Sequence, residues 1–405
     1  MPGDLAVTAV DAADHPAAGA LAAGADDVTA LALWLAAERG AAGGGTPKWA
    51  PLLATLPATV DTPVLWADEE RAVLLRGSPA LAEARARDAA LDEAHARLVE
   101  AAGGTAPPWL SRDAFRSAVA VVTATAAYLP AAGCFALLPV LSRASRSGAP
   151  DAAVLDYDEA RGAAVLTANR AYAPGDAVDV ADGRPNGELL LATGAVDARG
   201  GDADCLTVTV GLAATDRMRS TKLQILDAVG LADGQPFPIK RGGFPLQLLS
   251  YLRLARLQDP AQLAAVTFEK DVVVSPANEY EVLQLLLGEC RERLSAYVGG
   301  AEEDTKLLQD ATLTPRARVA ASLRLGEKRI LQATLDAARR RLAPIRGVPT
   351  KDGSLRDANA DFVEMFDAFE ALPSVPKKMV DGLLSWARGE GDPEYQERWG
   401  KKKKK

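Results

Sequence analysis

The sequence is poor in the residues on which many active sites depend. It contains three cysteines, Cys134, Cys205 and Cys290, and two histidines, His15 and His95. The cysteines are odd in number, lie far apart and lack the C-x-x-C spacing of zinc sites, so neither a zinc site nor a disulfide framework is expected. Two histidines argue equally against a histidine metal site and a Ser-His-Asp triad. The sequence therefore predicts no metal site and a reducing, intracellular location.

The sequence also lacks a long apolar run and an excess of positive charge. No uncharged apolar stretch reaches the roughly 18 residues of a membrane span, so none is predicted. The formal net charge is -8, which argues against nucleic acid as a partner. The one basic run, Lys401–Lys405, is typical of a solvated terminal tail. The acidic N-terminus does not resemble a targeting peptide, so we expect either no N-terminal address or a chain that begins after one.

Hydrophobic spacing divides the chain near residue 213. Before it, helices over about 27–40 and 78–102 are followed by short apolar runs and a hairpin over 157–168. After it, helical spacing dominates, with helix starts at Ser275-Pro276 and Thr314-Pro315. The predicted fold class is α+β. Its parts are a short-stranded domain with inserted helices (1–212), an all-α domain (213–343) and a C-terminal extension (344–405).

Three segments resemble the family of Rubisco-type lysine methyltransferases, which are SET-domain enzymes followed by a helical substrate-binding domain. The strongest match runs from Asn278 to Leu331 and includes AEED, LTPRAR and RLGEKRIL. The second is WAPLLATLPATVDTPVLWADEE, and the third is GDAVDVADGRPNGELLLATGAV. The resemblance implies that residues 1–212 form a SET-like domain without its N-terminal part. It also implies that residues 213–343 form a domain of the substrate-binding type.

The same resemblance indicates where this chain departs from the family. Such enzymes use a glycine-rich loop, polar side chains that fix S-adenosylmethionine and a tyrosine at the methyl-transfer channel. The resemblance implies that this glycine loop would lie before the first residue of the sequence, so we expect none within it. The family's polar and aromatic positions fall on Ala126, Ser142, Ser145, Arg146, Asp182 and Thr193. None of these offers an amide, an imidazole or a phenol. The sequence therefore predicts no catalytic residue, no cofactor-binding residue and no cofactor.

Two functions remain open. The first is a non-catalytic scaffold or interaction subunit that binds protein partners through its helical C-terminal domain, within a larger assembly. By analogy with the family, that assembly would lie in the chloroplast, and otherwise in the cytoplasm; membrane attachment would be peripheral and through the complex. The alternative is an active S-adenosylmethionine-dependent protein-lysine N-methyltransferase, with a cofactor site rebuilt from other residues. Binding of S-adenosylmethionine separates the two hypotheses.

Overall fold

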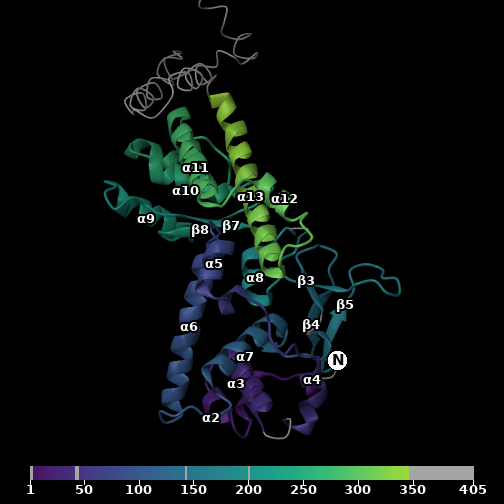
Figure 1. The fold of residues 1–405 in the computed structure, drawn as a ribbon. Coiled ribbons are helices and arrows are strands. Elements are labelled where there is room, and N and C mark those ends of the chain that lie inside the picture. The colour runs from purple at the N-terminus through teal and green to yellow at the C-terminus, as the bar shows by residue number, and fades with distance from the viewer. Residues whose placement is uncertain (1–2, 42–44, 142–143, 199–200, 346–405) are drawn as a thin grey trace, which may run out of the picture. The chain divides into compact units, whose positions relative to one another are not determined.

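The computed structural model describes residues 3–41, 45–141, 144–198 and 201–345 (Figure 1). It divides into two compact units. Unit 1 comprises Met1–Cys205 with Ser295–Lys328, and unit 2 comprises Leu206–Leu294 with Arg329–Lys405. Helix α13 (Pro315–Ile345) contributes its first part to unit 1 and its remainder to unit 2. The domain boundaries expected after residues 212 and 343 stay predictions. Ser142 and Lys401–Lys405 lie outside the described residues.

Unit 1 combines helices with short strands. Its strands form three two-stranded sheets, of which β3 with β6 is parallel, while β1 with β2 and β4 with β5 are antiparallel. The predicted hairpin is confirmed as β4–β5. The helices are α1 (Ala9–Ala13), α2 (Gly19–Ala22), α3 (Asp27–Gly40), α4 (Ala50–Thr55), α5 (Asp68–Leu74), α6 (Pro79–Ala101), α7 (Arg112–Thr125), α8 (Asn186–Thr193) and α12 (Ala301–Leu307). The strands are β1 (Ala127–Leu129), β2 (Cys134–Ala136), β3 (Ser145–Ser147), β4 (Val154–Asp158), β5 (Ala163–Thr167) and β6 (Asp179–Ala181).

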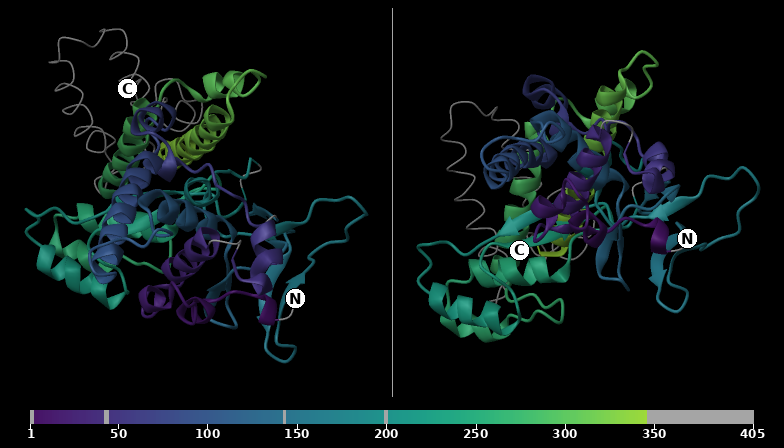
Figure 2. Two further views of the ribbon diagram at one scale, coloured as in Figure 1. Left: turned by 60° about the horizontal axis from the view of Figure 1, so that its bottom comes forward. Right: turned by 90° about the horizontal axis from the view of Figure 1, so that it is seen from below.

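The core of unit 1 lies around α3. Leu31, Trp34 and Leu35 of this helix are at most 1% exposed, as expected of a helix that is apolar on every face. Asp26 caps its start, because the Asp26 carboxylate accepts the backbone N–H of Thr29 at 3.0 Å. Helix α3 packs against α7, and α1 and α2 pack against α3 (Figure 2). The helix predicted over about 27–40 is confirmed.

Helix α8 was not predicted from the sequence, although it contains most of the apolar run GELLLATGAV. Leu189, Leu190 and Leu191 are successive buried residues, so the run has neither the alternation of a strand nor a helical stripe. Gly194 ends the helix in the left-handed conformation, with φ of 73°. A Cβ at Gly194 would lie 2.3 Å from the carbonyl oxygen of Asp61, so only glycine fits here. The end of α8 is therefore held against the loop that contains Asp61.

Asn186 anchors the start of α8 with both ends of its amide. Its Nδ2 donates to the Asp204 carboxylate at 3.0 Å and to the Asp197 carbonyl at 3.1 Å, and its Oδ1 accepts the Asp197 N–H at 2.7 Å. Asn186→Ala should lower the free energy of unfolding of unit 1 by about 2 kcal/mol, because these partners lose their hydrogen bonds in a largely buried place. Urea unfolding measures this loss. Glu188→Ala on the same helix is the control, and equal losses in both variants would contradict the prediction.

Unit 2 is mainly helical. Its helices are α9 (Arg219–Ala228), α10 (Leu246–Arg256), α11 (Pro276–Ala296) and the second part of α13, and its strands are β7 (Leu206–Val210) and β8 (Gln235–Ile239). The helix starts predicted at Ser275-Pro276 and Thr314-Pro315 are confirmed. Together the two units confirm the α+β fold class. None of the described helices is long and apolar enough to cross a membrane.

Strand β8 lies in the region that we expected to be all-α. It pairs antiparallel with β7, and Phe237 and Ile239 alternate with Pro236 and Pro238 along it. The two apolar side chains are buried and the two prolines are exposed. Because proline cannot donate a backbone hydrogen bond, it is tolerated only in strands with a free edge, and this strand has one partner. Because proline is rare in strands, these two prolines argue against a strand when only the sequence is considered.

The start of the strongest family segment has a structural role in unit 2. Glu279 is 1% exposed and pairs with Arg253, whose Nε lies 2.5 Å from Glu279 Oε2. The Nδ2 of Asn278 donates to the Arg253 carbonyl at 3.1 Å. These two side chains therefore join α11 to α10 through one buried arginine, which explains why polar residues occupy these buried positions.

Candidate functional site

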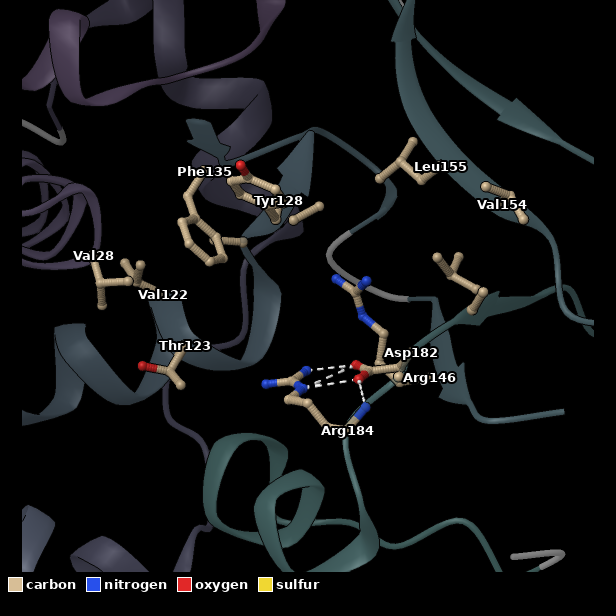
Figure 3. Close-up of a pocket in the computed structure, with 15 residues that line it drawn as sticks. Val28, Val122, Thr123, Tyr128, Phe135, Arg146, Val154, Leu155, Asp182 and Arg184 are labelled. Carbon is tan, nitrogen blue, oxygen red and sulfur yellow. Dashed lines mark hydrogen bonds and ion pairs between the residues drawn. The ribbon is translucent and has the colours of Figure 1, made fainter. Parts of the chain in front are cut away.

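The parallel pairing of β3 with β6 brings two of the predicted positions together. In this register Arg146 lies opposite Val180, two residues before Asp182. Ala126, the C-terminal cap of α7, lies on the same cavity as Arg146 and Asp182. This cavity has a volume of about 410 Å³, and we name it the Tyr128 cavity after the aromatic residue on its wall (Figure 3). Thr123, Phe135 and Arg184 also line it.

A second cavity collects the other described positions. It also has a volume of about 410 Å³ and is lined by Ser145, Arg146 and Thr193, together with Thr125 and Asp61. We name it the Thr193 cavity. Arg146 is the one residue that lines both cavities as they are described. The structure thus places every described family position on one or both cavities, while Ser142 lies outside the described residues.

The negative charge of Asp182 is balanced by Arg184 within the Tyr128 cavity. Arg184 donates to the Asp182 carboxylate from Nε at 2.9 and 3.2 Å and from Nη2 at 2.6 Å, and the Arg184 backbone N–H donates at 3.0 Å. Burial alone would raise the pKa of Asp182, but the hydrogen bonds from Arg184 outweigh it, so this pKa lies below its ordinary value. Asp182 is therefore ionised near neutral pH and cannot serve there as a proton donor.

Arg146 has no comparable partner. The only hydrogen bond that its side chain makes within the described part of the chain is from Nη2 to the Thr125 carbonyl, at a long 3.5 Å. Burial lowers the pKa of its guanidinium, and the charge of Asp182 opposes this effect. Arginine nevertheless stays protonated in proteins. The site therefore contains a half-buried positive charge at the end of α7.

Three residues of the Tyr128 cavity were missed by the sequence analysis: Tyr128, Phe135 and Arg184. Tyr128 and Phe135 are opposite one another in the β1–β2 hairpin, with ring centroids 5.2 Å apart. The short pattern AYLPAAGCFA contains a turn between two aromatic residues, a signal that could have identified this hairpin. Arg184 carries no such signal, because its role depends on the approach of Asp182. None of the aligned family positions offers a phenol, but Tyr128, at another position, supplies one to this cavity.

The described residues contain no group of three or more His, Cys, Asp or Glu side chains that could hold a metal ion. The Nε2 of His95 lies 2.9 Å from the Leu110 carbonyl oxygen, which can only accept a hydrogen bond. His15 lies 3.3 Å from the buried Glu38 carboxylate. Neither histidine lines the two cavities.

Comparison with known proteins agrees with this architecture. Residues 213–331 match the family described as Rubisco LSMT substrate-binding. The chain is 31% identical over 166 residues to a chloroplastic Rubisco large subunit N-methyltransferase of Nicotiana tabacum, covering 39% of this chain and 34% of that protein. It is 25% identical over 336 residues to an actin-histidine N-methyltransferase of Rattus norvegicus, covering 76% and 55%. The chain thus spans about a third to a half of these relatives.

A solved structure shares the fold over most of its length. It is the SET domain of LSMT bound to lysine and AdoHcy, with a TM-score of 0.71 and 20% identity, covering 90% of this chain and 87% of that one. The expectation of no cofactor is overturned by this likeness, because the structures with the same fold contain AdoMet or AdoHcy. The family's polar and aromatic side chains are missing at the aligned positions, but the fold brings Tyr128, Phe135 and Arg184 to the cavity from other positions. The matched substrate-binding segment, the related sequences and the SET fold together support a Rubisco LSMT-like SET family for this chain.

Proposed function

We propose that the chain is an S-adenosylmethionine-dependent protein-lysine methyltransferase with its reaction site in unit 1. The observation that carries the proposal is the pair of cavities that share Arg146. Methyl transfer needs a donor and an acceptor held in two sites that meet, so that the reacting atoms are aligned in advance. Each cavity, at about 410 Å³, lies within the roughly 300–1,000 Å³ of ligand pockets.

The Tyr128 cavity suits the methyl donor. S-adenosylmethionine supplies an electrophilic methyl group on a sulfonium cation, and it also carries a carboxylate and an adenine ring. The cavity offers guanidinium groups from Arg146 and Arg184, a carboxylate from Asp182 and the aromatic rings of Tyr128 and Phe135. Guanidinium groups bind carboxylates, and aromatic rings stack on planar ligands. The residue types therefore fit the donor, although they differ from those of the family.

The Thr193 cavity suits the acceptor side chain. Its lining includes the hydroxyl groups of Thr125, Ser145 and Thr193 and the carboxylate of Asp61. Lysine is the preferred acceptor, because the SET-domain structure of the same fold holds lysine beside AdoHcy. The match of residues 213–331 to a substrate-binding family supports a protein substrate. A chloroplast location belongs to this proposal and is supported by the chloroplastic tobacco relative.

The proposal predicts transfer of a radioactive methyl group from S-adenosylmethionine to a lysine-containing protein in a plant chloroplast extract. Tyr128→Phe should slow the transfer at least ~10-fold, because Tyr128 carries the only phenol among the described lining residues of either cavity. Tyr172→Phe, which lies outside both cavities, is the matched control. Equal rates in the two variants would remove Tyr128 from the reaction.

As a second candidate function, the chain would bind the cofactor and the protein substrate without transferring a methyl group. It is favoured by one observation: Asp182 and Thr193 occupy the positions at which the resembled family has aromatic residues, and Arg184 already occupies the Asp182 carboxylate. Such a chain would be an interaction subunit of an assembly. Binding of S-adenosylmethionine by isothermal titration, without label in any extract protein, would favour this function over the first.

A further inference from the structure

Arg146 differs from the three buried arginines of unit 1. Arg71, Arg116 and Arg324 each lie close to a carboxylate oxygen, at 2.7 Å from Asp88, 2.9 Å from Asp92 and 2.8 Å from Asp304. No carboxylate of the described residues lies within 4.0 Å of Arg146, and the single hydrogen bond of its side chain is the long one to Thr125. A half-buried charge without a counterion raises the free energy of the folded chain, so binding of an anion beside Arg146 would be favourable.

The nearby carboxylate cannot supply that counterion. Asp182 influences Arg146 electrostatically, but its two oxygens accept the hydrogen bonds of Arg184. Arg184 in turn adds a second positive charge, which disfavours the charged form of Arg146. A bound anion would therefore stabilise the site more strongly. Arg146, Asp182 and Arg184 together carry a net charge of +1 in the cavity.

The direction of the side chain indicates what kind of anion would fit. Figure 3 shows the Arg146 guanidinium directed toward the part of the cavity that contains Tyr128 and Phe135, with Arg184 and Asp182 joined beside it. A ligand with a carboxylate and a planar ring can therefore place the first on Arg146 and the second against the aromatic pair. Guanidinium and carboxylate form two parallel hydrogen bonds, which fix the orientation of the ligand.

We propose that Arg146 is the receptor for the amino-acid carboxylate of S-adenosylmethionine and thereby the residue that positions the cofactor. This inference rests on the proposed function. It assigns a binding role to a position at which the resembled family has a different residue. In this arrangement Arg146 on β3, beside the C-terminal end of α7, supplies the positive charge that binds the carboxylate.

The test compares two ligands that differ in the carboxylate. S-adenosylhomocysteine contains it, whereas 5′-methylthioadenosine keeps the adenine, ribose and sulfur but lacks the amino-acid part. Isothermal titration of the full chain should give at least a ~10-fold weaker dissociation constant for S-adenosylhomocysteine after Arg146→Met. The constant for 5′-methylthioadenosine should change less than ~3-fold. Arg146→Lys should lie between, because lysine keeps the charge but not the bidentate geometry.

Arg161→Met, on the exposed turn of the β4–β5 hairpin, is the matched control for loss of one charge. Equal weakening of both ligands by Arg146→Met and Arg146→Lys, or no weakening of either, overturns the inference while leaving cofactor binding intact. A wild-type chain that binds neither ligand overturns the proposed function itself and the inference with it. If Arg146→Met does not fold by circular dichroism, Arg146→Lys still decides, because it too must discriminate between the ligands.

Discussion

Asp304→Ala is expected to lower the free energy of unfolding of unit 1 by about 4 kcal/mol. Asp304 is 2% exposed, and its two carboxylate oxygens accept hydrogen bonds from Arg324 Nη2 at 2.8 Å and Lys328 Nζ at 2.6 Å. Both cations are themselves almost fully buried. Removing the shared carboxylate leaves two charges without a counterion, and breaking such a pair costs about 3–5 kcal/mol.

Urea unfolding followed by tryptophan fluorescence measures this loss, since Trp34 and Trp66 lie in the core of unit 1. Glu302→Ala is the control, because Glu302 is an exposed acid in the first turn of the same helix and should contribute less than ~1 kcal/mol. Adding Lys328→Met to Asp304→Ala should recover part of the stability, because one of the two uncompensated charges is then removed. A loss below ~1 kcal/mol in Asp304→Ala would show that water replaces the carboxylate.

The stability of the chain is expected to fall by about 3 kcal/mol between pH 4.5 and pH 7 because of Glu327. Burial raises the pKa of Glu327 from 4.5 to about 7, although hydrogen bonds from Ser78 and Tyr297 oppose this effect. Between these two values the folded chain holds a proton that the unfolded chain has released. Folding is therefore favoured by acid in this window, and each unit of pKa shift corresponds to about 1.4 kcal/mol.

Glu327→Gln is the variant that tests this dependence, because an amide matches the protonated carboxyl in shape and stays neutral at every pH. The unfolding free energy of the variant relative to wild type should rise by about 3 kcal/mol from pH 5 to pH 8. Two other charged groups contribute to the environment of Glu327: Asp204 raises its pKa and Arg324 lowers it. Glu302→Gln, at an exposed position, should show no such trend. Parallel pH profiles for wild type and Glu327→Gln would refute the assignment.

These predictions bear on the segment that carries the strongest resemblance. Asp304 of AEED accepts hydrogen bonds from Arg324 and Lys328 of RLGEK, and Glu327 of the same motif accepts one from Ser78. All four motif residues are buried. Buried charges tolerate few substitutions, because each partner depends on the other. A motif of this kind identifies an architecture, and it does so whether or not methyl transfer has been retained. For this reason the sequence could indicate the family while leaving the activity open.

The candidate site could be predicted from the sequence only in its position. The resemblance to the family implied Ala126, Ser145, Arg146, Asp182 and Thr193 as site positions, and these residues line the two cavities. The chemistry of the cavities was not predicted, because it depends on side chains that no motif marks. The β1–β2 hairpin supplies the aromatic groups, and a neighbouring arginine neutralises the one carboxylate of the Tyr128 cavity.

The sequence by itself determined the features that local chemistry controls. Asp26, Ser275 and Thr314 mark helix starts because their side chains accept N–H groups three residues further on. Only the tertiary structure decided that GELLLAT is helical, that QPFPI is a strand, and that Arg146 is a cation without a counterion. The physical reason is the range of the interactions: a cap involves one turn of chain, whereas burial, strand pairing and charge compensation depend on residues that only the folded chain brings together.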